Sequence, residues 1–324
     1  MKILRCIKNY LTFGAISLSA ICSNAQLFPI KPINLVVPFV PGGGTDSIAR
    51  DIAKLLSEKL EQTVIVENKG GGGGAIGANF VAKAPADGHT LLFATSTFVT
   101  NSSLDEGLPF DADKDFAPIA MIGKGPILIV STKNLGLKTI QDFLIYAKKN
   151  PQSINFCSAG NGSINHLSAE LFKSKTGISM THIPYKGSGP ATIDLIAGRT
   201  QVFFSTVPTI LPFVKQNAVD LLAVSGGKRM ALFPGTPSTE EAGIKDLDVS
   251  TWWGILAPVG TPKAVVDKLN AAINEVSNKE LVKDRFASEG ATVQLGTAQE
   301  FQQTLRKELL MWRGLVKSAN LTMN

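Results

Sequence analysis

The sequence predicts an α/β fold with mainly parallel strands, and two observations support this prediction. Short runs rich in β-branched residues alternate with amphipathic helical patterns almost throughout the 324 residues, as in chains built from βαβ units. In addition, four glycine-bearing turns lie where an extended apolar run ends and a helical pattern begins. These turns are residues 41–46, 70–74, 158–163 and 185–190.

The N-terminal elements follow from the spacing of apolar residues. Strands are predicted at 33–40, 64–68 and 90–94, and helices at 47–60 and 75–84. The helix at 47–60 has an apolar stripe at helical spacing, while charged residues cover its other side. The stripe consists of Ile48, Ile52, Leu55, Leu56 and Leu60. We expect it to pack in the core.

The middle third of the chain, 124–224, has the pattern of a separate unit. Its elements are a strand at 127–131, a helix near 139–150, strand–turn–helix units at 154–176 and 180–198, and strands at 201–205 and 221–225. If this is one lobe, the chain leaves a first lobe near residue 123 and returns near 225. Lobe 1 would then be 26–123 with 225–324, and lobe 2 would be 124–224. The cleft between two such lobes is the usual place for a ligand.

Two helix starts are recognisable near the C-terminus. Thr261-Pro262 opens a helical pattern with one apolar stripe. Thr297, followed three residues later by Glu300, forms a capping box, after which apolar residues recur at helical spacing from Phe301 onward. We expect both helices to pack on the core.

Residues 1–25 have the pattern of a secretory signal peptide. A basic start is followed by the apolar run 11–21 and by small residues that end at Ala25. We expect cleavage near Ala25 and a periplasmic location. Lipidation of Cys22 is the less favoured alternative, because Ile21 is a poor residue directly before a lipidated cysteine. The apolar run is too short to span a bilayer, and no later run is long enough.

The charge balance does not indicate a nucleic-acid partner. The whole chain has a formal net charge of +6, part of which lies in the signal segment, and no Lys/Arg cluster is interleaved with aromatic residues. After cleavage Cys157 is the one cysteine left, so no intramolecular disulfide can form. Because it lies in the apolar run 154–157, we expect a buried small residue rather than a reactive thiol.

The glycine turns suggest how a ligand could be held. Glycine lets backbone come close to a ligand, and the first N–H groups of a helix have no partner within that helix. Such a turn offers hydrogen-bond donors together with the positive end of the helix dipole, which suits a carboxylate or a phosphate. Several of these turns in one chain indicate a small organic anion held mostly by backbone groups.

Several motifs occur in an order typical of one family. They are PINLVVPFVPGGGTD at 32–46, VEN at 66–68, ADGHTLL at 86–92, IPYKG at 183–187, TPSTEEAG at 236–243, WG at 253–254, the turn 258–262 and KLN at 268–270. On these motifs the chain resembles the substrate-binding proteins of tripartite tricarboxylate transporters, the Bug or TctC-like family. The resemblance covers essentially all of the mature chain.

The resemblance implies a periplasmic binding protein of type II, a two-lobed "Venus flytrap". Such a protein captures a small carboxylate, for example a di- or tricarboxylate, and delivers it to a permease made of a large and a small integral-membrane subunit. It implies no cofactor, no metal and no catalytic residue, and we expect a monomer. A periplasmic sensor that docks on a signalling partner is the alternative, because both proteins would bind the same ligands by the same closure.

The predicted ligand-binding residues come from the turns and from the ends of strands. They are Phe39, Gly43, Gly44, Thr45, Thr95, Ser96, Ser158, Ala159, Gly160, Gly162, Ser163, Tyr185, Lys186, Gly187 and Ser205. Asp46 is assigned to capping of the helix, because its charge would repel a carboxylate. For Lys186 we favour contact through neighbouring N–H groups over a desolvated ion pair. The run 70–74 is either the floor of the cleft or a flexible turn.

Two positions depart from the family pattern. His89 stands where tyrosine is usual, which we interpret as a packing variation. Ser205 stands where many relatives carry an acidic residue that would suit an ammonium group. The serine therefore favours a simple organic acid over an amino acid.

Enzyme motifs fit the sequence poorly. No glycine turn carries the Lys-Ser/Thr of a Walker A motif, and 160–163 has the wrong order for a G-x-S-x-G elbow. The run 42–44 lacks dinucleotide-binding spacing, and the three histidines lack the spacing of a zinc site. Ser163 and His166 could share one helix face, but no third acid is evident. A hydrolase is therefore the least favoured function.

Overall fold

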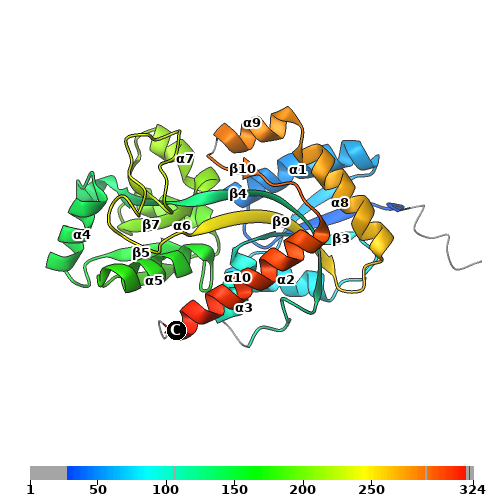
Figure 1. Cartoon of the computed structure of the whole chain (residues 1–324), viewed down its shortest axis with the longest axis horizontal. Coiled ribbons are helices and arrows are strands. Elements are labelled where there is room, and N and C mark those ends of the chain that lie inside the picture. The colour runs from blue at the N-terminus through cyan, green and yellow to red at the C-terminus, as the bar shows by residue number, and fades with distance from the viewer. Residues whose placement is uncertain (1–27, 105–106, 289, 319–320, 322–324) are drawn as a thin grey trace, which may run out of the picture.

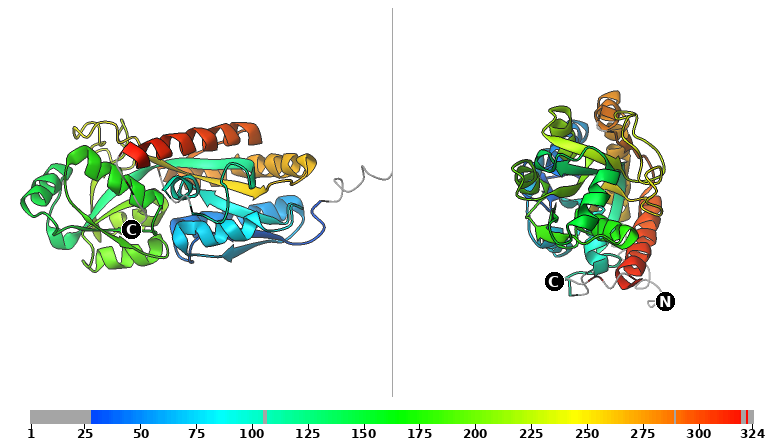
Figure 2. Two further views of the ribbon diagram at one scale, coloured as in Figure 1. Left: turned by 90° about the horizontal axis from the view of Figure 1, so that it is seen from below. Right: turned by 90° about the vertical axis from the view of Figure 1, so that its left-hand side faces the viewer.

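The structure is a computed structural model, and it describes residues 28–104, 107–288, 290–318 and 321. The predicted signal segment 1–25, with Cys22, lies outside the described residues. Figure 1 shows two halves side by side, with the strands β4 (Phe116–Thr132) and β9 (Ser250–Pro258) running between them. Figure 2 shows the same arrangement from two further directions.

The remaining strands are short. They are β1 (Ile33–Val37), β2 (Val64–Asn68), β3 (Thr90–Thr95), β5 (Asn155–Ser158), β6 (Thr181–Pro184), β7 (Val202–Thr206), β8 (Val219–Val224) and β10 (Thr292–Val293). We call the part built on β1, β2 and β3 the first half, and the part built on β5, β6, β7 and β8 the second half. The two-lobed α/β architecture predicted from the sequence is confirmed.

The helices cover both sides of the strands. They are α1 (Gly44–Leu60), α2 (Ala75–Ala82), α3 (Thr97–Leu104), α4 (Ile140–Lys149), α5 (Ile164–Thr176), α6 (Ser188–Ile196), α7 (Val207–Lys215), α8 (Lys263–Ser277), α9 (Glu280–Ser288) and α10 (Ala298–Ser318), with short 3₁₀ turns at η1 (Gly72–Gly74) and η2 (Lys133–Leu135). Helices α4 to α7 belong to the second half (Figure 1).

The strands form one mixed sheet in the order β2-β1-β3-β9-β4-β7-β5-β6, and β8 and β10 both pair with β4. The pairs β1–β2, β1–β3, β5–β6 and β5–β7 are parallel, as βαβ units predict. Every described pair that includes β4 or β9 is antiparallel. The sheet is therefore mixed rather than mainly parallel, because β4 and β9 lie at its middle and run against their neighbours on both sides.

One continuous strand is shared between the halves. β4 pairs with β9 from Phe116 to Pro126, and from Ile127 onward it pairs with β7 and β8. The β4–β9 pairing ends at Pro126, opposite Ser250. The two points at which the chain passes between the halves are therefore neighbours in the sheet.

The segment 225–249 packs beside β8 of the second half. The N–H of Val224 donates to the carbonyl of Pro237 (3.0 Å), and the N–H of Thr239 donates to the carbonyl of Val224 (2.8 Å). The chain then enters the first half through β9. The division into 26–123 with 225–324 and 124–224 stays a prediction, and these contacts favour a return at β9 rather than near residue 225.

Because side chains alternate along β9, this strand contributes to the core on both faces of the sheet. Trp252 and Trp253 are both fully buried, and they point to opposite faces of the sheet. Trp252 meets Phe301 of α10 edge to face (5.2 Å between ring centroids), and Trp253 meets Phe286 of α9 in the same way (5.7 Å). Cys157 is buried and unpaired, as its apolar run predicted.

The helix starts confirm one prediction and correct another. The capping box is formed: Glu300 N donates to Thr297 Oγ1 (3.1 Å), and Thr297 N donates to Glu300 Oε2 (2.7 Å). The assignment of Asp46 to the helix cap is wrong, because α1 begins earlier and its N-cap is Gly43. Asp46 instead occupies the third helical position, and its side chain accepts from the N–H of Gly42 just before the helix (3.3 Å).

Candidate anion-binding site

A narrow pocket lies between the two halves. It encloses about 410 Å³ of unfilled space, including the part open to solvent. Its lining residues come from both halves, and Thr251 lies beside the crossing point at Ser250. They are Phe39, Val40, Gly43, Gly44, Thr45, Asp46, Thr95, Thr97, Ala159, Ile164, Asn165, Ser188, Thr206 and Thr251.

Five helices begin at this pocket. Gly44, Thr97, Ile164 and Ser188 are the first residues of α1, α3, α5 and α6, and Thr206 is the N-cap of α7. Each helix start carries N–H groups without intrahelical partners and the positive end of a dipole. The pocket therefore suits an anion without any cationic side chain.

Asp46 is the charged residue among the described residues that line the pocket. Its carboxylate is bound by Arg50 Nη2 (3.0 Å) and by Asn68 Nδ2 (2.8 Å). Burial alone would raise the pKa of Asp46, but the hydrogen bonds from Arg50, Asn68 and Gly42 outweigh it and hold the pKa below the ordinary value. Asp46 is thus ionised and its charge is neutralised by Arg50, so it does not oppose an anion in the pocket.

The turn 158–163 is fixed by contacts from both halves. Within its own half, Ser163 is the N-cap of α5 and its Oγ accepts from His166 N (3.3 Å). From the first half, Thr100 Oγ1 donates to the carbonyl of Gly162 (2.7 Å), and Thr97 Oγ1 accepts from Ile164 N (3.2 Å). The start of α3 is therefore hydrogen-bonded directly to the turn that opens α5.

Glycines allow the two halves to come this close. Gly44 N donates to Thr209 Oγ1 of α7 (3.2 Å), and a Cβ at Gly44 would lie 2.7 Å from Pro208 Cβ. Gly73 lies against the carbonyl of Asn161 and close to Gly160. The run 70–74, which the sequence left open between two roles, thus contacts the turn 158–163 of the second half, and none of its residues lines the pocket. Its backbone lies mostly in the left-handed region that only glycine adopts easily.

The fourth glycine turn, 185–190, faces the first one. A Cβ at Gly187 would lie 3.1 Å from a methyl group of Val40, and one at Gly189 would lie 3.7 Å from the carbonyl of Gly42. Lys186, directly before Gly187, is exposed. The Tyr185 hydroxyl donates to Asp194 (2.6 Å) and is engaged outside the pocket.

The structure brings together six of the fifteen predicted site residues in the lining of the pocket. These are Phe39, Gly43, Gly44, Thr45, Thr95 and Ala159. The others lie in the turns or behind them and are Ser96, Ser158, Gly160, Gly162, Ser163, Tyr185, Lys186, Gly187 and Ser205. Ser96, for example, accepts from Trp252 N (2.9 Å), and Ser205 is fully buried with its hydroxyl on the carbonyl of Thr206 (3.2 Å). Ligand contact by any of these residues remains a prediction.

Besides Asp46, five polar lining residues are not among the fifteen predicted ones: Thr97, Asn165, Ser188, Thr206 and Thr251. Four of them lie at helix starts, as the residues of the glycine turns do. Thr251 gave no such signal, because it lies near the start of β9, a strand that the sequence analysis did not predict. Its hydroxyl is fully buried and has no hydrogen-bond partner among the described residues.

The pairing expected of a hydrolase is not formed by the side chains of Ser163 and His166. His166 Nδ1 accepts from Gly162 N (3.2 Å), and Ser163 Oγ caps the helix.

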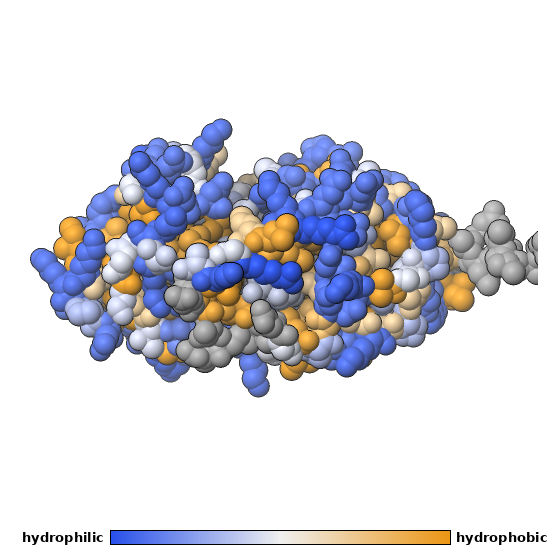
Figure 3. Space-filling view, turned by 60° about the horizontal axis from the view of Figure 1, so that its bottom comes forward, coloured by the Kyte–Doolittle hydropathy of each residue, from blue (hydrophilic) through white to orange (hydrophobic). Residues whose placement is uncertain are grey.

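Among the described residues no cluster of three His, Cys, Asp or Glu side chains could hold a metal ion. Within the same residues no helix combines the length and apolarity needed to cross a membrane. Figure 3 shows a face on which hydrophilic side chains surround smaller apolar areas.

The comparisons with known proteins agree on one family. The family model of the tripartite tricarboxylate transporter family receptor matches residues 48–321. Protein BugT of Bordetella pertussis is 34% identical over 296 residues, which is 91% of each chain. The solved periplasmic binding protein BugD is 33% identical with a TM-score of 0.88, over 91% of this chain and 99% of its own.

Two further solved structures are named with carboxylate ligands. Rpa4515 of R. palustris, with adipate, is 33% identical with a TM-score of 0.88, over 91% of this chain and 99% of its own. MatC of Rhodopseudomonas palustris, with bound malate, is 31% identical with a TM-score of 0.85, over 89% of this chain and all of its own. The resemblance drawn from the motifs is confirmed, and the chain belongs to the tripartite tricarboxylate transporter receptor family of periplasmic solute-binding proteins.

Proposed function

We propose that this protein binds a small organic dicarboxylate in the pocket between its halves and presents it to a membrane permease. The observation that supports this most strongly is the meeting of five helix starts at one pocket with no Lys or Arg among its described lining residues. Backbone dipoles there can hold a carboxylate and still release it, since no desolvated ion pair must be broken. Adipate in Rpa4515 and malate in MatC support the same ligand class.

The hydroxyl groups of the pocket favour a ligand with polar groups at both ends. Thr95, Thr97, Thr206 and Thr251 can each donate to a carboxylate or to a ligand hydroxyl. An ammonium group would find the carboxylate of Asp46 already occupied by Arg50. We therefore infer a dicarboxylate or hydroxy-dicarboxylate rather than an amino acid, in agreement with the serine at position 205.

Thr251 is the side chain whose hydroxyl we expect to bind the ligand directly. A buried hydroxyl without a partner is costly, and a ligand oxygen would satisfy it. Thr251→Val should weaken malate binding, while Thr200→Val, at a threonine that is equally buried but outside the pocket, should not. Calorimetry with succinate, malate and adipate measures this difference. Equal affinities in wild type and Thr251→Val would remove Thr251 from the site.

A thermal-shift screen tests the ligand class. A ligand present at 100 times its dissociation constant stabilises the folded state by about 2.7 kcal/mol. We expect stabilisation by dicarboxylates and none by arginine, and the bound acid should be recovered chemically unchanged. A screen in which only amino acids stabilise the protein, or one in which the acid is converted, would contradict the proposal.

Delivery to a permease and a periplasmic location are the remaining parts of the proposal. The family description and the predicted signal segment support them. The tests are fractionation of the native protein and uptake of labelled malate by cells that lack this gene. Uptake that does not depend on the protein, together with capture of a sensor kinase by the liganded form, would favour the sensing alternative.

A further inference from the structure

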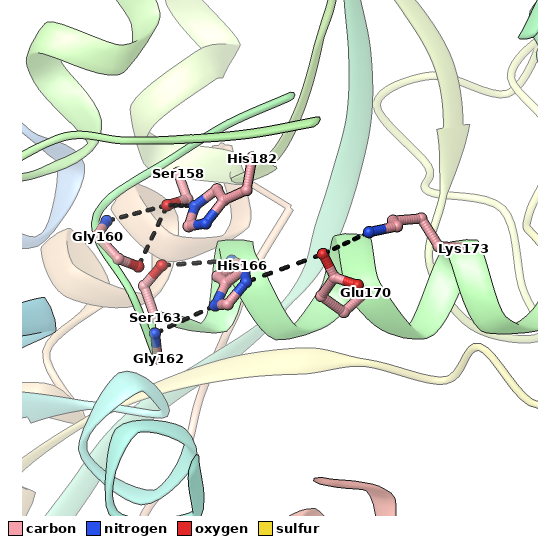
Figure 4. Close-up of polar contacts among 8 residues, drawn as sticks. All are labelled: Ser158, Gly160, Gly162, Ser163, His166, Glu170, Lys173 and His182. Atoms are coloured by element: carbon pink, nitrogen blue, oxygen red, sulfur yellow. Dashed lines mark hydrogen bonds and ion pairs between the residues drawn. The ribbon is translucent and has the colours of Figure 1, made fainter. Parts of the chain in front are cut away.

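Two histidines from different elements are stacked beneath the turn 158–163. The rings of His166 on α5 and His182 on β6 are nearly parallel (7°), with centroids 4.0 Å apart. Phe156 of β5 continues the stack, 4.8 Å from His182. Figure 4 shows both rings directed toward the turn, one toward each of its ends. Neither histidine is among the residues that line the pocket.

Each ring makes a hydrogen bond to one end of the turn. His182 Nε2 lies 2.6 Å from Ser158 Oγ, and that hydroxyl oxygen accepts from Gly160 N (3.1 Å). At the other end, Gly162 N donates to His166 Nδ1 (3.2 Å). A backbone N–H can donate only to an unprotonated ring nitrogen, so His166 must be neutral with its proton on Nε2. The turn is therefore shaped by side chains that its own sequence does not contain.

We propose that neutral His166, supported by its stacking on His182, is a positioning residue that holds the turn 158–163 in the shape that receives the anion. The expected effect on ligand binding rests on the proposed function. The expected effect on the shape of the turn rests on the geometry alone. Gly160 and Gly162 both have positive φ angles, so the turn needs external hydrogen bonds to fix it. Fixing it also places the start of α5 at the pocket.

The surroundings keep both rings neutral. Burial lowers the pKa of His166 to about 4, with a smaller contribution from the charge of Lys173. Burial, His166 and Lys173 lower the pKa of His182 to about 3. Glu170 Oε1 is 3.9 Å from His166 Nε2, but it is paired with Lys173 Nζ at 2.8 Å.

The other elements packed on this pair carry no charge that would change this result. α3, β5 and β7 contain no acidic or basic side chain. Cys157 follows Phe156 on β5, and its side chain points to the opposite face because side chains alternate along a strand. A second proton on His166 would place a donor against Gly162 N, so the same geometry predicts that the turn loosens when His166 is protonated.

Three variants separate positioning from mere packing. In His166→Asn, Oδ1 can take the place of Nδ1 as acceptor, whereas His166→Leu fills the space and leaves Gly162 N without a partner. His89→Leu is the matched control, because His89 is also buried (6% exposed) but lies in the first half beside Phe28. We expect His166→Leu to weaken malate binding about tenfold or more, and the other two variants to stay within about threefold of wild type.

Nuclear magnetic resonance supplies a readout that needs no ligand. In the wild type, His166 should show a proton-free Nδ1, and the exchange protection of the Gly162 amide should be lost as the pH falls through about 4. In His166→Asn that protection should persist at the same pH, and in His166→Leu it should be absent throughout. A protonated Nδ1 near neutral pH, or the same pH profile in wild type and His166→Asn, would overturn the proposal.

The two proposals fail in different ways. If malate and adipate do not bind the wild type, the dicarboxylate function fails, while the ring tautomer and the Gly162 exchange still decide the role of His166. If the wild type binds malate and His166→Leu binds it equally well, the positioning proposal fails and the function stands.

Discussion

Gly44 offers the sharpest test of our proposal that the two halves close on the ligand. It is the first residue of α1, and its backbone is within hydrogen-bonding distance of α7 in the second half. A Cβ at this position would lie 2.7 Å from Pro208 Cβ and 2.7 Å from Thr209 N, which is closer than side-chain carbons normally approach. Alanine fits helical backbone better than glycine does. Gly44→Ala should therefore leave the fold stable and oppose only the approach of the two halves.

The size of the effect follows from the two contacts that closure would lose. Overpacking of a tight contact costs about 1–3 kcal/mol, and the Gly44–Thr209 hydrogen bond contributes about 0.5–1.5 kcal/mol. The closed state is thus destabilised by roughly 1.5–4.5 kcal/mol relative to the open one. Since each 1.4 kcal/mol is tenfold, ligand affinity should fall by roughly 10- to 1,600-fold.

The assays are calorimetry with malate and small-angle scattering with and without it. The wild type should become more compact on binding, and Gly44→Ala should not at the same malate concentration. Gly314→Ala is the control, because Gly314 lies in α10 with nothing near its missing Cβ. Wild-type affinity in Gly44→Ala would refute the reasoning that this glycine is required for closure.

Three further predictions concern single side chains. Lys186→Met should cost less than about 1.5 kcal/mol of malate binding, because Lys186 is exposed and is not among the residues that line the pocket; a larger loss in calorimetry would give its ammonium group a direct role. Asp46→Asn should lower the melting temperature above about pH 4, since the pKa of Asp46 is below that of the unfolded chain; the difference should vanish as the pH falls through the folded value. The Cys157 thiol should not react with iodoacetamide in the native protein, because burial raises its pKa to about 12; rapid labelling would contradict the buried position.

Local features of the fold could be predicted well from the sequence. The strand Val64–Asn68 and the capping box at Thr297 are set by neighbouring residues, and the structure has both where the pattern placed them. The start of α1 was misplaced because Gly44 is held by a contact with Thr209, which is distant in sequence. Patterns of neighbouring residues do not predict such a contact.

The pocket was predictable only in outline. Glycine turns identified the starts of α5 and α6, because the signal of such a turn lies in consecutive residues. Thr251 and the His166–His182 stack could not be found in this way, since both depend on how β9 and β6 are placed beside other elements. The antiparallel β9 also explains why the sheet is mixed, which the alternation of strands and helices did not indicate.

The shared strand β4 determines what kind of motion the protein can make. Its two crossing points, Pro126 and Ser250, are partners in an antiparallel ribbon. Hydrogen bonds between the two strands oppose shearing of this ribbon in its plane, whereas bending out of the plane breaks none of them. We therefore expect opening to follow one direction rather than free rotation about a loose linker. A permease that binds this protein would thus meet two defined surfaces, one in the open form and one in the closed form.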